Sequence, residues 1–161
     1  MIRAATVTRV FEQAIDTITL DETERHRRRM AMRSDGGIDF LLDLSEAKLL
    51  SDGDGLELED GRVIAVREKA EALYEVRSRD AKHLLVLAWQ IGNRHLPAEV
   101  HEDRIYIRRD HVIRDMLIGL GATVLDVERA FVPEKGAYHS GMPGGHAHHH
   151  HRHHGHTHHH D

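Results

Sequence analysis

The chain of 161 residues contains no cysteine, and this absence excludes several kinds of structure at once. Without thiols there are no disulfides, no thiolate zinc sites and no iron–sulfur clusters. Any metal ion must therefore be held by imidazole nitrogen and by oxygen. Such ligands suit Ni(II), Zn(II), Cu(II) and Co(II) better than Mg(II) or Ca(II).

Long apolar runs are missing as well. No stretch approaches the roughly 20 apolar residues of a membrane-spanning helix, and the first residues lack the apolar run and cleavage site of a signal peptide. We therefore expect a cytoplasmic protein that does not enter a membrane. The formal net charge of −5 with neutral histidines argues against nucleic acid as a partner.

Catalytic motifs are the third absence. The sequence has no GxSxG nucleophile, no Walker A loop and no GxGxxG fingerprint. Outside the C-terminal tract it has five histidines, at dispersed positions. We expect a protein that is not an enzyme.

Residues 1–69 have the pattern of an all-β domain. Turn signals such as Asp35-Gly36-Gly37 and Asp60-Gly61 separate short β-prone segments, and no segment has the period of a helix. This pattern predicts a small β-sandwich or barrel. The basic run Arg25–Arg29, which includes His26, is interpreted as a solvated strand face. The expected strands are residues 4–10, 17–20, 25–33, 38–44, 56–58 and 62–67.

Residues 70–138 have a mixed pattern. Apolar residues recur at helical spacing from Asp80 to about Gly92, with Ser78 as the candidate N-cap and His83 on the polar side. A second helix is expected after Asp110, which is a good N-cap residue. Strands are expected at residues 72–77, 99–101, 104–108 and 123–131. The order βαββαβ predicts a ferredoxin-like domain, so the fold class is α+β.

Residues 139–161 form a histidine tract that we expect to be disordered, because it has almost no apolar surface to bury. A run of imidazoles can wrap a borderline divalent ion with several nitrogens. A purification tag is the main alternative, but Ala147, Arg152, Gly155 and Thr157 interrupt the tract. The composition does not choose nickel over zinc or copper, and Cu(II) should bind most tightly. The predicted ligands are His139, His146, His148, His149, His150, His151, His153, His154, His156, His158, His159 and His160.

Two histidines outside the tract are candidate ligands. His95 should be exposed on a short turn, and a symmetric dimer could place two copies opposite each other. His111 follows Asp110 at the start of a helix, where the helix dipole favours a neutral imidazole able to bind metal. Asp110 is then an oxygen ligand or an orienting partner of His111.

Three motifs carry a family resemblance. Gly92-Asn93-Arg94-His95-Leu96-Pro97, then Asp110-His111-Val112, then Pro133-Glu134-Lys135-Gly136-Ala137-Tyr138 before a histidine-rich tail resemble the urease accessory nickel chaperones of the UreE family. The resemblance extends along the whole chain. It implies a protein-binding β-domain, a metal-binding ferredoxin-like domain and a homodimer in which both copies of His95 hold Ni(II).

The resemblance also carries further expectations. His111 matches a second metal position, but Arg109 stands where some members have another histidine, and a guanidinium cannot be a ligand. His139 matches a tail ligand that joins the His95 pair. The implied function is binding of Ni(II), with Zn(II) or Cu(II) as competitors, and its delivery to the urease apoprotein with other accessory proteins, including the GTPase UreG. The alternative is a histidine-rich nickel or zinc buffer or storage protein without specific delivery.

Overall fold

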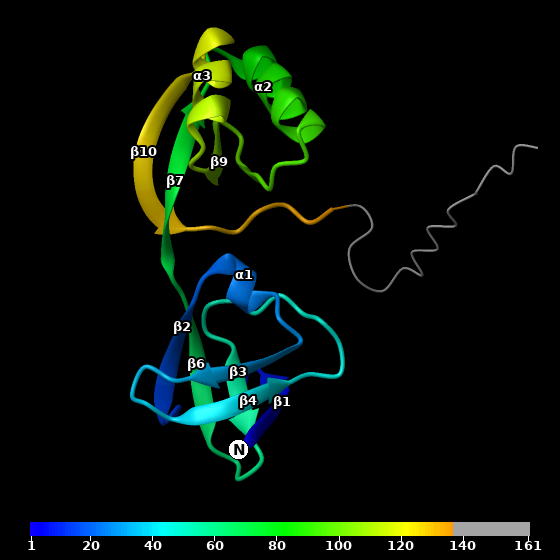
Figure 1. Cartoon of the computed structure of the whole chain (residues 1–161), viewed down its shortest axis with the longest axis vertical. Helices are drawn as coiled ribbons and strands as arrows, with labels where there is room; N and C mark the ends of the chain where they lie inside the picture. The colour runs from blue at the N-terminus through cyan, green and yellow to red at the C-terminus, as the bar shows by residue number, and fades with distance from the viewer. Residues whose placement is uncertain (137–161) are drawn as a thin grey trace, which may run out of the picture.

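The computed structural model describes residues 1–136, which form two sheets (Figure 1). This arrangement confirms the predicted α+β class, with an all-β half before a mixed half. The predicted tail, with His139 and the eleven histidines from His146 to His160, lies outside the described residues.

The first sheet has six strands in the order β2-β6-β5-β1-β4-β3. Predicted turns lie where expected, and Gly37 and Gly61 have φ of 98° and 87°, which residues with a Cβ rarely adopt. Alternate side chains such as Phe40, Leu42 and Ile64 are buried in the core. The strands are β1 (Arg3–Thr8), β2 (Asp16–Leu20), β3 (Arg29–Arg33), β4 (Asp39–Asp43), β5 (Gly55–Leu58) and β6 (Val63–Glu68).

This sheet curls into a half-barrel, because the turn between β3 and β4 bonds to β2 at the opposite end of the strand order. The Asp35 amide donates to the Thr17 carbonyl at 2.8 Å, and Ser34 Oγ donates to Asp16 Oδ2 at 2.5 Å. The carboxylate of Asp16 also accepts from the amides of Thr17 and Gly36. These donors, Ser34 first, lower the pKa of Asp16.

A short helix, α1 (Glu22–Arg25), ends where the predicted strand 25–33 was to begin, and β3 starts only at Arg29, so that prediction is wrong over residues 25–28. The cause is a capping box. The Asp21 carboxylate accepts from the Glu24 amide at 2.8 Å, and the Glu24 carboxylate accepts from the Asp21 amide at 3.1 Å. The solvated strand face predicted around His26 is also wrong, because His26 is the C-cap of this helix.

The second sheet is antiparallel, with the order β10-β7-β9-β8, which confirms the ferredoxin-like arrangement. Both helices lie on the same face of the sheet (Figure 1), and Leu87, Ile91 and Leu117 pack against it. Burial of each such side chain contributes about 1.5–3 kcal/mol. The elements are β7 (Ala70–Arg77), α2 (Ala81–Asn93), β8 (Glu99–Val100), β9 (Arg104–Arg108), α3 (His111–Gly119) and β10 (Thr123–Ala130).

The start of α2 differs from the prediction in two ways. Asp80, not Ser78, is the N-cap, because its carboxylate accepts from the His83 amide at 2.8 Å. His83 is buried, with 6% of its surface exposed, and is not on the solvated side. Its Nδ1 accepts from the Arg79 amide and its Nε2 donates to the Leu120 carbonyl at 2.8 Å. The imidazole thus ties the start of α2 to the end of α3.

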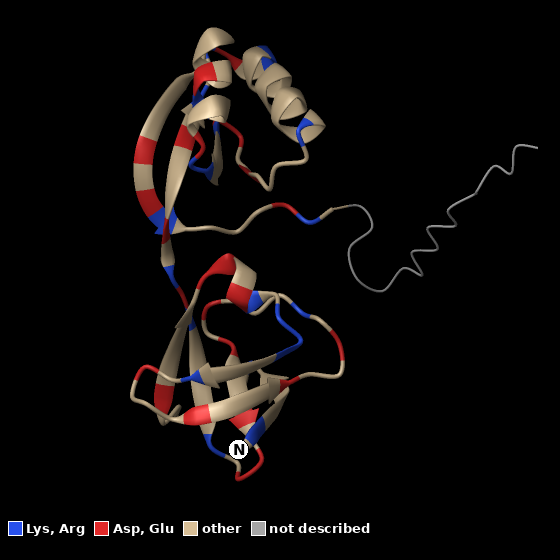
Figure 2. Cartoon of the chain, viewed as in Figure 1, with Lys and Arg blue, Asp and Glu red and all other residues tan. Residues whose placement is uncertain are grey.

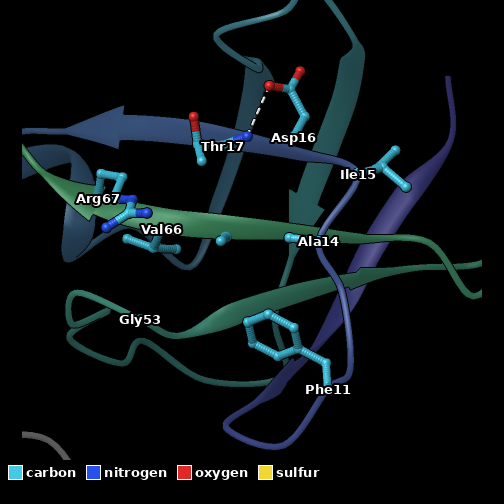
Figure 3. A pocket seen from close by; sticks show the side chains of 9 residues that line it. Phe11, Ala14, Ile15, Asp16, Thr17, Gly53, Val66 and Arg67 are labelled. Carbon is cyan, nitrogen blue, oxygen red and sulfur yellow. Dashed lines mark hydrogen bonds between the residues drawn. The ribbon is translucent and has the colours of Figure 1, made fainter.

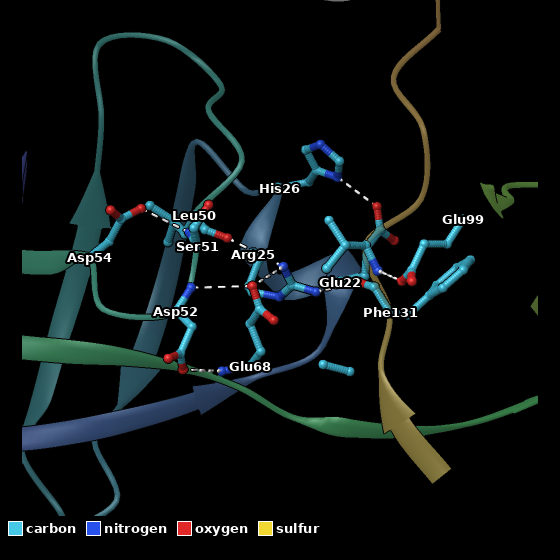
Figure 4. A network of polar contacts seen from close by, with 12 residues as sticks. Glu22, Arg25, His26, Leu50, Ser51, Asp52, Asp54, Glu68, Glu99 and Phe131 are labelled. Atoms are coloured by element: carbon cyan, nitrogen blue, oxygen red, sulfur yellow. Dashed lines mark hydrogen bonds and ion pairs between the residues drawn. The ribbon is translucent and has the colours of Figure 1, made fainter. Parts of the chain in front are cut away.

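The two domains are joined by more than the chain between β6 and β7. Arg25 of α1 is fully buried, and its Nη2 donates to the Phe131 carbonyl at 2.6 Å (Figure 4). Glu22 pairs with Arg108 of β9 at 2.6 Å. Figure 2 shows the acidic α1 on the side of the first domain that faces the second. Arg25 is therefore an interdomain contact and not part of a solvated face.

Candidate metal site around His95

His95 lies just after the C-cap of α2, in the left-handed conformation with φ of 56°. Its amide donates to the Gly92 carbonyl at 3.0 Å, which closes the end of the helix. Glycine usually occupies this position, because a side chain there costs about 1–2 kcal/mol. His95 is the only residue other than glycine with positive φ in the part of the chain that the structure describes.

The His95 side chain is exposed, as the sequence predicted. Its ring makes no hydrogen bond or ion pair within residues 1–136, so both ring nitrogens face solvent or a ligand. Strained positions persist where the surrounding structure fixes them, and they concentrate at functional sites. His95 therefore combines an unfavourable backbone conformation with an imidazole that has no polar partner among residues 1–136.

An open cavity of about 400 Å³ adjoins His95 and is shared by three parts of the chain. The first domain supplies Glu22 and His26, which are bonded to each other at 2.8 Å. The turn after α2 supplies His95, Leu96 and Pro97, and the segment after β10 supplies residues 133–136. The end of the described chain therefore borders the same cavity as His95.

Asp110, which belongs to the second predicted metal position, is the N-cap of α3. The Asp110 Oδ1 accepts from the amides of Val112 and Ile113 at 2.9 and 3.2 Å, as the sequence predicted for an N-cap. His111 is exposed beside it, with no bond from its ring among the described residues. Arg109 donates to the carbonyls of Leu73 and Val127, so it links β7 to β10.

No group of three His, Asp or Glu side chains that could hold a metal ion occurs within residues 1–136. The structure brings Asp110 next to His111, but it does not bring either of them together with His95 into one site. A single His95 imidazole is too few ligands for a transition metal. A metal ion bound at His95 would therefore need further ligands from beyond the described residues or from another chain.

A second pocket, of about 440 Å³, lies on the first domain (Figure 3). Phe11, Ala14 and Val66 make much of its lining apolar, and Asp16 with Arg67 are the charged residues that line it. It contains no histidine, and Asp16 is committed to Ser34 and to two amides. This pocket is not a candidate metal site.

The outer side of the two helices is unusually apolar. Trp89, the only tryptophan of the chain, is 64% exposed, and Leu85 and Val112 are exposed to a similar extent. Leu85 and Trp89 are one turn apart on α2, so they form one stripe that runs toward the His95 turn. Exposed apolar groups of this kind often mark a contact with another protein. None of the helices within residues 1–136 is both long and apolar enough to cross a membrane.

Known proteins resemble this chain along nearly all of its length. Residues 2–69 match the model of the UreE urease accessory protein N-terminal domain, and residues 71–160 match that of the C-terminal domain. The β-domain followed by a ferredoxin-like domain is thus that of a urease accessory protein, and not of a urease catalytic chain. The chain belongs to the UreE family.

Individual proteins similar to this chain are also urease accessory proteins of the UreE family. The chain is 70% identical over 149 residues to the urease accessory protein UreE of Chelativorans sp. strain BNC1, covering 92% of this chain and 94% of the relative. It is 50% identical over 146 residues to UreE 1 of Brucella suis biovar 1, covering 88% and 90%. It is 49% identical over 150 residues to UreE of Azorhizobium caulinodans, covering 91% and 72%.

Two residues beside the site were missed by the sequence predictions. Glu99 is 5% exposed and bonds to the backbone after Phe131, and Arg25 bonds to Phe131 itself (Figure 4). Arg25 belongs to a basic run that is typical of a solvated face, so no local signal distinguishes it. The spacing Asp21-x-x-Glu24 does indicate a capping box and would have located the helix that presents Arg25.

Proposed function

We propose that this urease accessory protein is a nickel chaperone, which binds Ni(II) and delivers it for assembly of the urease metallocentre. The observation that carries the proposal is His95, an exposed imidazole held in a backbone conformation that favours glycine. A residue whose backbone costs the fold stability, and whose side chain makes no hydrogen bond or ion pair in return, is kept for another reason. Metal binding is the chemistry that an exposed neutral imidazole offers.

Residues 1–69 would contact partner proteins, residues 70–138 would carry the metal, and residues 139–161 would supply additional imidazoles. The predicted partners are the urease apoprotein and other accessory proteins, including the GTPase UreG. Zn(II) and Cu(II) would compete for the same ligands. The absence of a preformed cluster within residues 1–136 suits a chaperone, because transfer to a partner requires ligands that exchange easily.

A homodimer would complete the site. The apolar stripe of Leu85 and Trp89 on α2 is a surface that a second copy could cover, and it ends about one turn before the last residue of that helix, Asn93. In a symmetric pair every residue near the axis meets its own copy. Two His95 imidazoles would then hold one ion, with His139 and the other tail histidines completing its coordination. His111 with Asp110 would form a weaker second position.

The variant His95→Gly tests this proposal without disturbing the backbone. Because glycine adopts positive φ at little cost, we expect the variant to be as stable as the wild type or more stable by about 1 kcal/mol. Calorimetric titration of the full chain with Ni(II) should show that the tightest site, shared by a pair of chains, is gone. Binding by the tail histidines should remain.

His111→Gly is the control, because it removes another exposed imidazole and leaves His95 intact. An unchanged tight site in His95→Gly would refute the proposal. Urease activation in cells separates delivery from storage. If the protein only stores nickel, the His95→Gly variant should still support urease activation in proportion to the ions that it binds. If it is a chaperone, the same variant should fail to activate urease although its tail histidines still bind Ni(II).

A further inference from the structure

The two outer edges of the first sheet differ. At one edge, β2 is covered by the turn between β3 and β4, because the Thr17 carbonyl accepts from the Asp35 amide at 2.8 Å and the Thr19 amide donates to Asp35 Oδ1 at 3.3 Å. At the other edge, β3 has β4 as its single neighbouring strand within residues 1–136. An edge strand presents a row of unpaired N–H and C=O groups unless something covers it.

The backbone bonds show which groups of β3 point outward. Arg28 and Ser34, on either side of β3, bond to residues just outside β4 at 2.9 and 2.8 Å. In an antiparallel pair such bonds recur at every second residue, so the even-numbered residues of β3 face β4. The N–H and C=O groups of Arg29, Ala31 and Arg33 therefore point away from β4. They make no hydrogen bond within residues 1–136, and backbone groups without a partner in the protein are usually hydrated.

This edge is also basic. Arg27, Arg28 and Arg29 are consecutive and exposed, and Figure 2 shows the basic residues before β3 as a stretch of blue ribbon. The guanidinium groups of Arg27 and Arg29 form no ion pair within residues 1–136, and that of Arg28 bonds to the neutral Leu44 carbonyl at 3.1 Å. The whole chain has a formal net charge of −5, so this local positive charge is opposite in sign to that of the protein.

The basic stretch is held in place on both sides. Before it, Arg25 is buried and bonds to the carbonyls of Leu50 and Phe131. After it, Met32 is buried in the core of the first domain, and β3 pairs with β4 along its whole length. A ligand would therefore not have to order this strand, which lowers the entropic cost of binding.

We propose that the edge of β3 binds an extended acidic segment of a partner protein, which adds to the sheet as a further strand. Main-chain bonds to Arg29, Ala31 and Arg33 hold the segment, and its Asp or Glu side chains face the arginines. This inference specifies the partner contact proposed for residues 1–69 and rests on the proposed function in that respect. It requires no metal ion.

The charges of this edge decide among possible partners. A second copy of this chain, paired antiparallel about Ala31, would place Arg29 of each copy opposite Arg33 of the other, and like charges directly opposite are destabilising. Nucleic acid is disfavoured by the net charge of −5, and its phosphates cannot donate to the outward C=O groups. Charged side chains on an edge normally prevent pairing with other strands, but arginine does not exclude a strand that carries Asp and Glu.

The test uses the full chain with a metal chelator at about pH 8, so that neither nickel nor protonated histidine contributes. The probe is a fluorescein-labelled peptide of about eight residues, long enough to cover β3 and its flanks, in which Glu and Thr alternate. Fluorescence anisotropy should show saturable binding below about 1 mM. A peptide with Lys in place of Glu, and an oligodeoxythymidine of the same charge as the acidic peptide, should bind at least about tenfold more weakly. Equal binding by either control would overturn the inference, as would no binding of the acidic peptide.

Arg29→Glu tests the contribution of charge. One attraction across the strands becomes a repulsion, so the peptide should bind roughly two- to thirtyfold more weakly. The matched control is Arg62→Glu, which reverses another exposed arginine of the first domain, in the turn between β5 and β6. It should leave the affinity almost unchanged. Equal losses in the two variants would show attraction to the domain as a whole and would overturn β3 as the site.

Ala31→Pro tests the backbone contact. Proline removes the N–H of residue 31, and an edge strand tolerates it where that N–H faces solvent. We therefore expect an unchanged circular dichroism spectrum and about five- to tenfold weaker peptide binding. A chain that no longer folds would show that this N–H is bonded within the fold, and full affinity would show that no strand is added. Either result would overturn the inference.

The peptide contact and the nickel site can fail separately. The peptide assay contains no nickel, so a chain that does not bind the peptide leaves the nickel proposal as it stands. A His95→Gly chain that keeps its tight nickel site would refute the proposed function, and its β3 edge should still bind the peptide.

Discussion

Replacement of Arg25 by methionine should be among the most destabilising single substitutions in this chain. Arg25 is fully buried, and it bonds to the Phe131 carbonyl at 2.6 Å, to the Leu50 carbonyl at 3.4 Å and to Glu68 at 3.5 Å. Methionine fills much of the same volume but donates no hydrogen bond. The contacts with Leu50 and Glu68 lie within the first domain, and the contact with Phe131 joins the two domains.

The magnitude follows from these contacts. A hydrogen bond from a charged donor contributes about 1.5–3 kcal/mol, and a buried acceptor left without a partner costs about 1–3 kcal/mol. Removal of one partner from a buried ionic network costs about 3–5 kcal/mol, which is the loss we expect for Arg25→Met. This is a large part of the 5–15 kcal/mol by which a typical protein is stable.

Urea denaturation in metal-free buffer measures this loss. Far-ultraviolet circular dichroism follows both domains, while fluorescence of Trp89 follows the second domain alone. Arg27→Met is the control, because Arg27 is exposed and neighbours Arg25 in the same basic run, and it should change the free energy of unfolding by less than about 0.5 kcal/mol. A cost below about 1 kcal/mol for Arg25→Met, or an equal cost for Arg27→Met, would refute the buried interdomain role.

Two further predictions concern other contacts. His83→Ala should lower the free energy of unfolding by about 2–3 kcal/mol, because the Leu120 carbonyl and the Arg79 amide lose their partner. Thermal unfolding measures this loss, with the exposed His111→Ala as the control. Equal losses in the two variants would contradict the prediction. The pKa of Asp16 is lowered in the folded state, so its stabilising effect is present above the usual aspartate value of about 3.9 and is lost as the pH falls through the folded value. Asp16→Asn should therefore make the urea midpoint depend less on pH below about 4, and parallel pH profiles would count against this.

Much of the fold was predictable because its signals are local. The order of strands and helices in residues 70–130 follows from the change between alternating and helical spacing of apolar residues, and Asp110 as N-cap was correctly identified. The turns at Gly37 and Gly61 follow from the need for positive φ. Helix α1 was missed because four residues are too few for a period, although its capping box was visible in the sequence.

The site was predictable only in part. The exposure of His95 follows from its place after a helix end, and its possible metal role follows from residue type and family resemblance. Its left-handed backbone was not predicted, because nothing local marks a histidine for a position that usually takes glycine. The sequence pattern also predicted, wrongly, that His83 lies on the solvated side of its helix. Helical spacing alone does not reveal that Leu120, at the end of α3, bonds to the His83 ring.

Sequence by itself determined which chemistry is available: nitrogen and oxygen ligands but no thiolates, a tract rich in imidazole, and the order of two domains. Tertiary structure alone decided which charged residues became structural. Arg25 meets Phe131 across 106 positions of the chain, and Glu99 meets Val132 across 33. Burial makes these bonds strong and their loss costly, and burial depends on elements far apart in sequence. No local pattern of residues encodes it.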